Sequence, residues 1–148
     1  MTLQNLLSIG KLKAHVANAL EIRRLLAAIE RNIADASVTE ISDESRFDIA
    51  YKAVMQCALA AMMASGYRPS TSEPGHHATL IQSLPLTLGL RPEVWIVLDA
   101  LRRKRNANDY TGDVVTKEMV AECVAQARAL QHVLEKHLQQ HHAGLLTG

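Results

Sequence analysis

Apolar residues recur every three or four positions over long stretches of the chain, a spacing typical of helices that bury one face. The first stretch predicts a helix over residues 11–34, followed by a polar break. Ser42 is a suitable N-cap for a second helix, because Asp43 and Glu44 behind it favour the positive end of the helix dipole. This second helix ends near Gly66. The inner faces of the two helices comprise Leu12, Val16, Ala19, Ile22, Leu26, Ile29 and Ile33, and then Phe47, Ala50, Tyr51, Val54, Ala58, Leu59 and Met62.

Three more helices are predicted beyond a loop at residues 66–75, which holds two prolines, two glycines and three hydroxyl side chains. A short helix over residues 76–84 comes first. Pro92 suits the first position of the next helix, and Thr116 suits the cap of a last helix that reaches residue 139. No segment shows the pattern of a strand. We therefore predict an all-α fold, an up-and-down bundle of four to five helices.

Composition agrees with one helical domain over residues 1–148. Hydrophobic residues make up 48% and charged residues 21%, both near the values of globular proteins. The formal net charge of +1 does not favour general binding of duplex nucleic acid, which depends on many phosphate contacts. Cys57 and Cys123 lie in apolar helical patterns, so we expect two buried, reduced thiols.

The beginning of the chain lacks the basic and then apolar order of a signal peptide. No run reaches the roughly 18 apolar residues of a membrane span. We therefore expect a cytoplasmic protein with no membrane partner.

The sequence LRRKRNANDY, near the end of the helix that starts at Pro92, carries the strongest candidate chemistry. At about 100° per residue, Arg105 falls in the apolar stripe of that helix and Arg102 falls on its flank. Arg103 and Lys104 face solvent. The basic run is therefore divided between inward and solvated charges.

An inward arginine needs a partner, because an unpaired buried charge is costly. A structural ion pair with Asp48 or Glu44 is one interpretation, and on physical grounds alone it is the favoured one. The other interpretation is a phosphate or nucleotide that supplies the negative charge. Asp109 returns to the inner side of the helix, where it can orient Arg105.

Three blocks resemble the HEPN superfamily, small helical domains named for nucleotide binding in higher eukaryotes and prokaryotes. Arg105, Asn106 and Tyr110 fit its Arg-Asn-x-x-x-Tyr signature at the end of a late helix. The sequences SRFDIAYKAVMQCALAAMMASGYRP and GHHATLIQSL resemble two earlier segments in the expected order. Together the blocks cover residues 43–110.

The resemblance implies a bundle that dimerises, with the polar motif in a cleft at or near the subunit interface. It implies a site for a nucleotide or an RNA phosphate formed by Arg102, Arg105, Asn106, Asp109 and Tyr110. Many relatives are components of toxin–antitoxin systems paired with a small nucleotidyltransferase, and some are metal-independent ribonucleases. We therefore expect no cofactor, a homodimer, and a nucleotidyltransferase or antitoxin as a candidate partner.

The chain departs from the ribonuclease pattern at one position. Four residues follow Arg105, and the next is Tyr110, where the ribonuclease relatives have a histidine. A tyrosine with a pKa near 10 is a poor general base at neutral pH. We therefore favour binding over cleavage. A ribonuclease that uses Arg105 and Tyr110, and a non-catalytic helical dimer or partner-binding protein, stay open as alternatives.

Histidines form two further groups. His76 and His77 follow the loop and can either reach Arg105 or have no role, and the second interpretation is favoured because geometry comes first. His137 and His141 are one helical turn apart beside His142, but no carboxylate or cysteine stands at matching spacing. We therefore expect no metal site.

Overall fold

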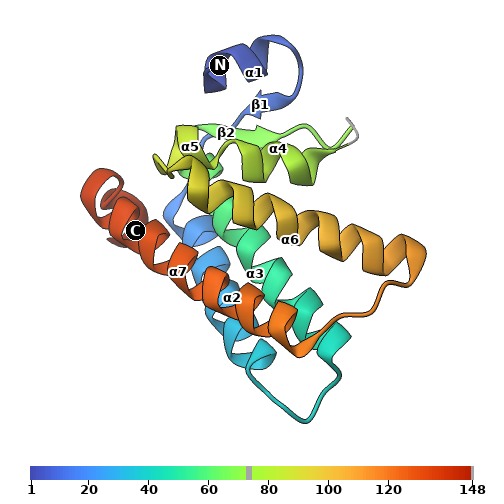
Figure 1. Ribbon diagram of the computed structural model, residues 1–148. Coiled ribbons are helices and arrows are strands. Elements are labelled where there is room, and N and C mark those ends of the chain that lie inside the picture. The colour runs from blue at the N-terminus through green and yellow to red at the C-terminus, as the bar shows by residue number, and fades with distance from the viewer. Residues whose placement is uncertain (73–74, 148) are drawn as a thin grey trace.

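The computed structural model describes residues 1–72 and 75–147, which form helices around one central helix (Figure 1). In chain order the described elements are α1 (Leu3–Ser8), β1 (Leu12–Ala14), α2 (Ala19–Ala36), α3 (Asp43–Ala64), β2 (Tyr67–Pro69), α4 (His76–Gln82), α5 (Leu84–Thr87), α6 (Pro92–Thr111), α7 (Lys117–His141) and α8 (Gly144–Thr147). The structure is 73% helical, which confirms the predicted all-α bundle. Among the described residues, α2, α3, α6 and α7 are long helices, and the others have seven residues or fewer.

The central helix, α3, is apolar on nearly all sides and packs mainly against α2 and α7. Phe47, Cys57 and Met62 are fully buried along it, and its many alanines let the neighbouring helices approach closely. A helix that is apolar all round belongs in a core or in a membrane. By length and composition α3 could cross a membrane, and 67% of its most apolar window is buried within the bundle.

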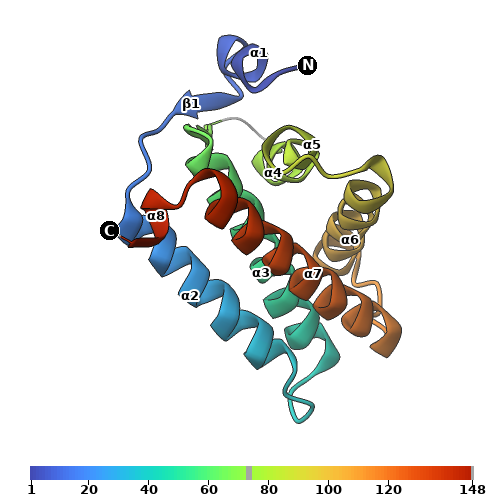
Figure 2. The same ribbon diagram turned by 90° about the vertical axis from the view of Figure 1, so that its left-hand side faces the viewer.

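The four long helices alternate in direction, as expected for an up-and-down bundle. Figure 2 shows α2 on one side of α3 and α6 on the other, and α7 lies in front of α3 between them. Because α4 and α6 both contact α3 and each other, they form a wall along its side away from α2. This wall defines the candidate site.

The predicted start of the first long helix is wrong. Residues 12–14 form strand β1, which pairs antiparallel with β2, with Leu12 opposite Pro69 and Ala14 opposite Tyr67. The helix starts only at Ala19, because the side chain of Asn18 accepts a hydrogen bond from the backbone N–H of Glu21. The prediction that the chain has no strand is wrong for the same reason.

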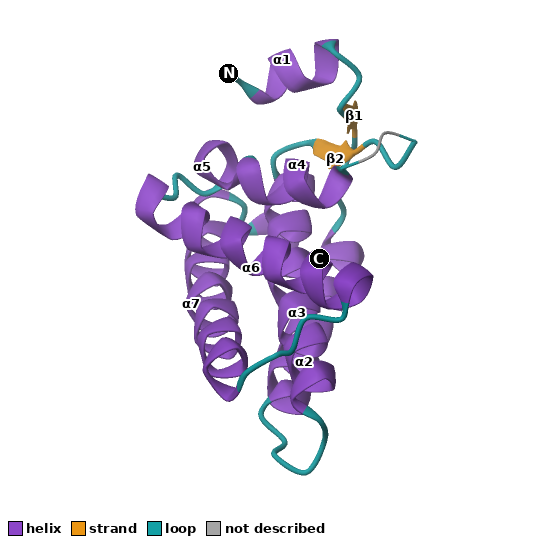
Figure 3. Cartoon of the chain, turned by 45° about the vertical axis from the view of Figure 1, so that its right-hand side comes forward, coloured by secondary structure: helices purple, strands orange, loops and turns teal. Residues whose placement is uncertain are grey.

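The first residues of the inner face predicted for the first long helix therefore lie outside that helix. Leu12 is buried, but from a strand, and Val16 is 92% exposed in the connection to α2. Figure 3 shows α1 and β1 outside the helical bundle, attached to it through β2. Ile22, Ile29 and Ile33 are buried as predicted.

The other helix ends lie close to their predicted positions. Ser42 caps α3 with its side chain, Pro92 opens α6, and Thr116 caps α7, as the sequence indicated. The predicted helix over residues 76–84 is divided into α4 and α5. Both cysteines are free and buried, which confirms the prediction of two buried, reduced thiols.

Candidate functional site

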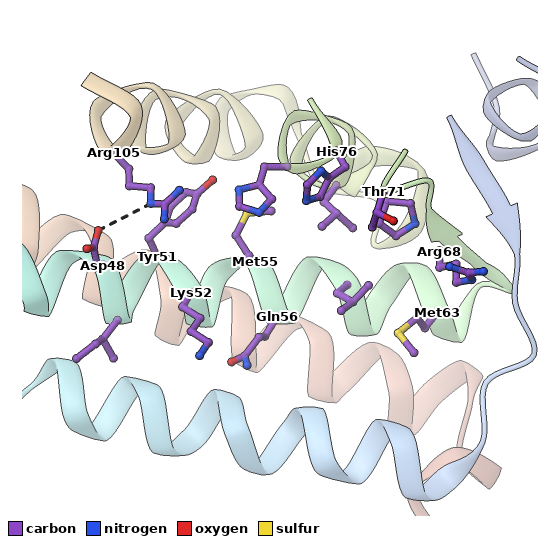
Figure 4. A pocket seen from close by; sticks show the side chains of 15 residues that line it. Asp48, Tyr51, Lys52, Met55, Gln56, Met63, Arg68, Thr71, His76 and Arg105 are labelled. Carbon is purple, nitrogen blue, oxygen red and sulfur yellow. Dashed lines mark ion pairs between the residues drawn. The ribbon is translucent and has the colours of Figure 1, made fainter. Parts of the chain in front are cut away.

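A groove of about 640 Å³ runs along α3 and is bounded by β2, α4 and α6 (Figure 4). Its floor is mainly apolar and includes Ile49, Met55, Leu59, Met63 and Leu80. Its polar and charged side chains include Asp48, Lys52, Gln56, Arg68, His76, His77 and Arg105. The groove is therefore an apolar channel with charged ends, built from four segments that are distant in the sequence.

Arg105 reaches the groove from α6 and faces α3, as its helical phase predicted. Its Nε lies 3.8 Å from Asp48 and 3.5 Å from Asp109. Neither carboxylate accepts a hydrogen bond from that Nε, which is buried without a partner. The Arg105 side chain as a whole is 30% exposed and lines the groove. The predicted ion pair with Asp48 therefore exists, but it is long.

The ring of Tyr51 packs against the guanidinium group of Arg105. Its ring centre lies 5.2 Å from the guanidinium carbon, within the range of a cation–π contact. Tyr51 is 2% exposed, and its buried hydroxyl has no hydrogen-bond partner. Burial raises the pKa of Tyr51 to about 12, although the nearby Arg105 opposes the shift. Tyr51 is therefore a neutral ring that holds the arginine in place.

His76 and His77 both line the groove that Arg105 also lines. The His77 ring centre is 6.1 Å from that of Tyr51 and 4.7 Å from that of His76. Burial lowers the pKa of His77 below its usual value, and the positive charges of His76, Arg105 and Arg102 add to the effect. These effects favour the neutral form of the His77 imidazole.

Asp48 is the acidic side chain of this cluster, and its pKa is shifted by its surroundings. Burial raises the pKa of Asp48, and repulsion from Asp109 raises it further, while Arg105 lowers it. Lys52, on the next turn of α3, is exposed at the same end of the groove. This end thus holds two cations and one buried tyrosine, together with Asp48 and the nearby Asp109 as opposing carboxylates.

The structure does not bring the five predicted binding residues together. Arg102 donates a hydrogen bond of 2.9 Å to Asp99, and Arg103 lies 3.3 Å from the same carboxylate. Asp99 is only 4% exposed, so it holds these charges on the flank of α6, outside the groove lining. Arg103 is solvated as predicted, with a side chain that is 74% exposed.

The remaining predicted residues lie at the end of α6. Asn106 is half-buried but does not line the groove. Asp109 does not line the groove either, and its link to the site is the ion pair with Arg105. Tyr110 is 85% exposed and does not line the groove that Arg105 enters. The helix continues to Thr111, and five residues of helical rotation carry Tyr110 away from the side that Arg105 occupies.

Sequence reasoning missed Tyr51, Lys52 and Arg68 as groove residues. One signal was present, because Asp48 and Tyr51 are three residues apart and therefore share a face of α3. Arg68 had no such signal, since its position depends on the pairing of β2 with β1.

Histidines also cluster on α7, where the ring of His137 lies 4.8 Å from His141 and 5.4 Å from His142. Burial lowers the pKa of His137, and the two neighbouring histidines add to the shift. Within residues 1–72 and 75–147, no group of three or more histidine, cysteine or acidic side chains is placed to hold a metal ion.

Comparison of the chain with family models, with curated proteins and with solved structures found no match.

Proposed function

We propose that the groove binds the phosphate of a nucleotide or of RNA at its Arg105 end, as a HEPN-like helical domain would. One observation carries the proposal: Arg105 stands in an open groove with ion pairs too long to be hydrogen bonds. An arginine that only ties a fold together normally has its donors satisfied. A phosphate accepts two parallel N–H donors from a guanidinium, so it suits the outer nitrogens of Arg105.

The neighbouring groups favour the same ligand. Lys52 adds a second positive charge at this end, and the ring of Tyr51 keeps the guanidinium in one orientation. Asp48 and Asp109 oppose an anion, although burial and repulsion from Asp109 raise the pKa of Asp48 and so disfavour its charged form. A bound phosphate would raise the pKa of Asp48 further, since like charges repel.

Calorimetric titration with nucleoside monophosphates and short RNAs tests the proposal. We expect Arg105→Ala to weaken binding at least tenfold, because it removes the charged donors. Lys104→Ala is the matched control, since Lys104 is exposed on the same helix and does not line the groove. Equal affinity of the wild type and Arg105→Ala, or no binding by the wild type, rejects the proposal.

Cleavage of RNA is a second candidate function, favoured by the presence of His77 in the groove with Arg105. In this reaction the 2′-oxygen bonds to phosphorus while the bond to the 5′-oxygen breaks. Neutral His77 accepts the proton of the 2′-hydroxyl, water protonates the departing oxygen, and Arg105 stabilises the charge on phosphorus. A 2′,3′-cyclic phosphate product that His77→Ala abolishes and His132→Ala preserves would establish this reaction.

The biological setting is proposed on the resemblance alone. A role in a toxin–antitoxin system, a cytoplasmic location, and a nucleotidyltransferase or antitoxin partner follow from it. If the protein is a toxin, its expression in bacteria should arrest growth, and Arg105→Ala should relieve the arrest.

We also propose a homodimer, supported by large apolar side chains on the outer surface of α5 and α6. Leu86 is 42% exposed and Ile96 is 55% exposed. A non-catalytic helical dimer would show the same association without any ligand. Sedimentation of the wild type and of Ile96→Asp distinguishes a dimer that uses this surface from a monomer.

A further inference from the structure

The groove has cationic side chains at both of its ends. Asp48, beside Arg105, and Met63, beside Arg68, are fifteen residues apart on α3, which is about 22 Å along the helix axis. Figure 4 shows Arg105 at one end of this stretch and Arg68 beyond the other. A mononucleotide is too short to contact both arginines. Only a longer ligand could reach Arg68 while it is bound to Arg105.

The two ends differ in their acidic neighbours. Asp48 partly offsets Arg105, whereas no acidic side chain among the described residues lines the groove beside Arg68. Arg68 is exposed, and it takes part in no ion pair within the described part of the chain. Among the described residues, therefore, no carboxylate offsets its charge.

The floor between the two arginines suits flat apolar groups. Met55, Leu59 and Met63 follow one another along α3, and methionine adapts its shape to different partners. His76 stands on the opposite wall and offers an aromatic face. A nucleobase that stacks on the His76 ring needs no particular sequence, since every base has a π face.

We infer that the groove takes a single-stranded oligonucleotide of several residues, with one phosphate at Arg105, a later phosphate at Arg68 and the bases between them on the apolar floor. The inference rests on the proposed function, and it adds the class of ligand and the role of Arg68. In this arrangement only the longer ligands contact Arg68, while Arg105 contributes to the binding of every ligand.

Calorimetric titration with uridine 5′-monophosphate and with oligouridylates of two, four and six residues tests this inference. We expect affinity to rise at least tenfold between the monophosphate and the four-residue strand. Arg68→Ala should lower affinity for the four-residue strand about fivefold and leave the monophosphate unchanged. Arg105→Ala should lower affinity for both ligands.

The salt dependence of binding separates a direct contact from a structural effect. If Arg68 meets a phosphate, Arg68→Ala should reduce the slope of log affinity against log salt by about 0.7. Arg91→Ala is the matched control, because Arg91 is an exposed arginine outside the groove and should change neither affinity nor slope. Circular dichroism of each variant checks that the helices are intact.

Two outcomes overturn the inference while the proposed function survives. One is equal affinity for the monophosphate and the longer strands, and the other is an Arg68→Ala variant that binds four residues as tightly as the wild type. A dodecanedioate that binds where oligouridylates do not would instead identify an apolar dianion as the occupant. If no nucleotide of any length binds, the proposed function fails as well.

Discussion

The guanidinium carbon of Arg105 lies 5.2 Å from the ring centre of Tyr51, and this contact joins α6 to α3 at one end of the groove. The ring is buried and its hydroxyl has no partner, so the face of the ring rather than its hydroxyl is the useful part. A cation held over a buried ring keeps its orientation without losing its outer donors to a carboxylate. Tyr51 thus acts as a positioning residue for Arg105.

Tyr51→Phe is expected to leave the free energy of unfolding unchanged or to raise it by up to about 1 kcal/mol, because it removes an unpaired buried hydroxyl. Binding of uridine 5′-monophosphate should be preserved, since the ring stays under Arg105. Tyr51→Leu should weaken that binding even where the protein remains folded. Urea denaturation and calorimetry measure the two effects, and a loss of binding in Tyr51→Phe would show that the hydroxyl itself is used.

The stability of the protein should fall as the pH drops below about 6.5, in part because of His77. Its folded pKa is lowered, so between that value and 6.5 the unfolded chain binds more protons than the folded chain. Stability is therefore lost from pH 6.5 downward, and the loss is complete below the folded pKa. His137 contributes in the same direction.

Urea denaturation between pH 5 and pH 7.5 measures this dependence. His77→Gln should have a flatter dependence than the wild type, and His132→Gln, on the exposed surface of α7, should not. A wild type and a His77→Gln variant with the same pH dependence would contradict the prediction.

Asp99→Asn should lower the free energy of unfolding by about 2 kcal/mol or more. The neutral amide cannot balance Arg102, whose side chain is only 17% exposed. Glu93→Gln is the control, because it breaks an exposed pair with Arg91 and should cost less than about 1 kcal/mol. Equal costs in urea denaturation would mean that Asp99 is not a structural anchor.

Leu134→Ala should cost about 2–5 kcal/mol of folding free energy, since Leu134 is fully buried on α7 and its removal leaves a cavity. Leu20→Ala, at a leucine that is 50% exposed on α2, should change stability by only about 0.5 kcal/mol. Thermal or urea denaturation of both variants makes the comparison. Similar values for the two leucines would argue against α7 as part of the core.

The long helices could be predicted because their signals are local. Ser42, Pro92 and Thr116 mark helix starts through chemistry confined to a few neighbouring residues. The strand at residues 12–14 could not be predicted in this way, because Leu12 also fits the apolar spacing of a helix. Its partner, β2, lies more than fifty residues later, and only the tertiary structure brings the two together.

The site was predictable only at Arg105. Helical phase identified its direction and its Asp48 partner, since both depend on α6 and α3 being regular helices. Helical phase also places Asn106 and Tyr110 on other sides of α6. They were grouped with Arg105 because all three belong to the Arg-Asn-x-x-x-Tyr signature. His77 could not be assigned, because its approach to Arg105 depends on how the loop after β2 places α4.

The position of Arg68 depends on the two short strands, β1 and β2, and not on the helical bundle. Arg68 stands opposite Lys13 in the ladder, and His15 donates a further backbone hydrogen bond to Gly66. An isolated pair of strands is weak, and the chain between it and α2 is exposed at Val16. A protease that cuts there, or a partner that captures β1 as its own strand, would release one end of the groove and leave Arg105 in place. Loss of the amino-terminal segment would therefore remove the strand that pairs with Arg68, while Arg105 on α6 would keep its contacts with α3.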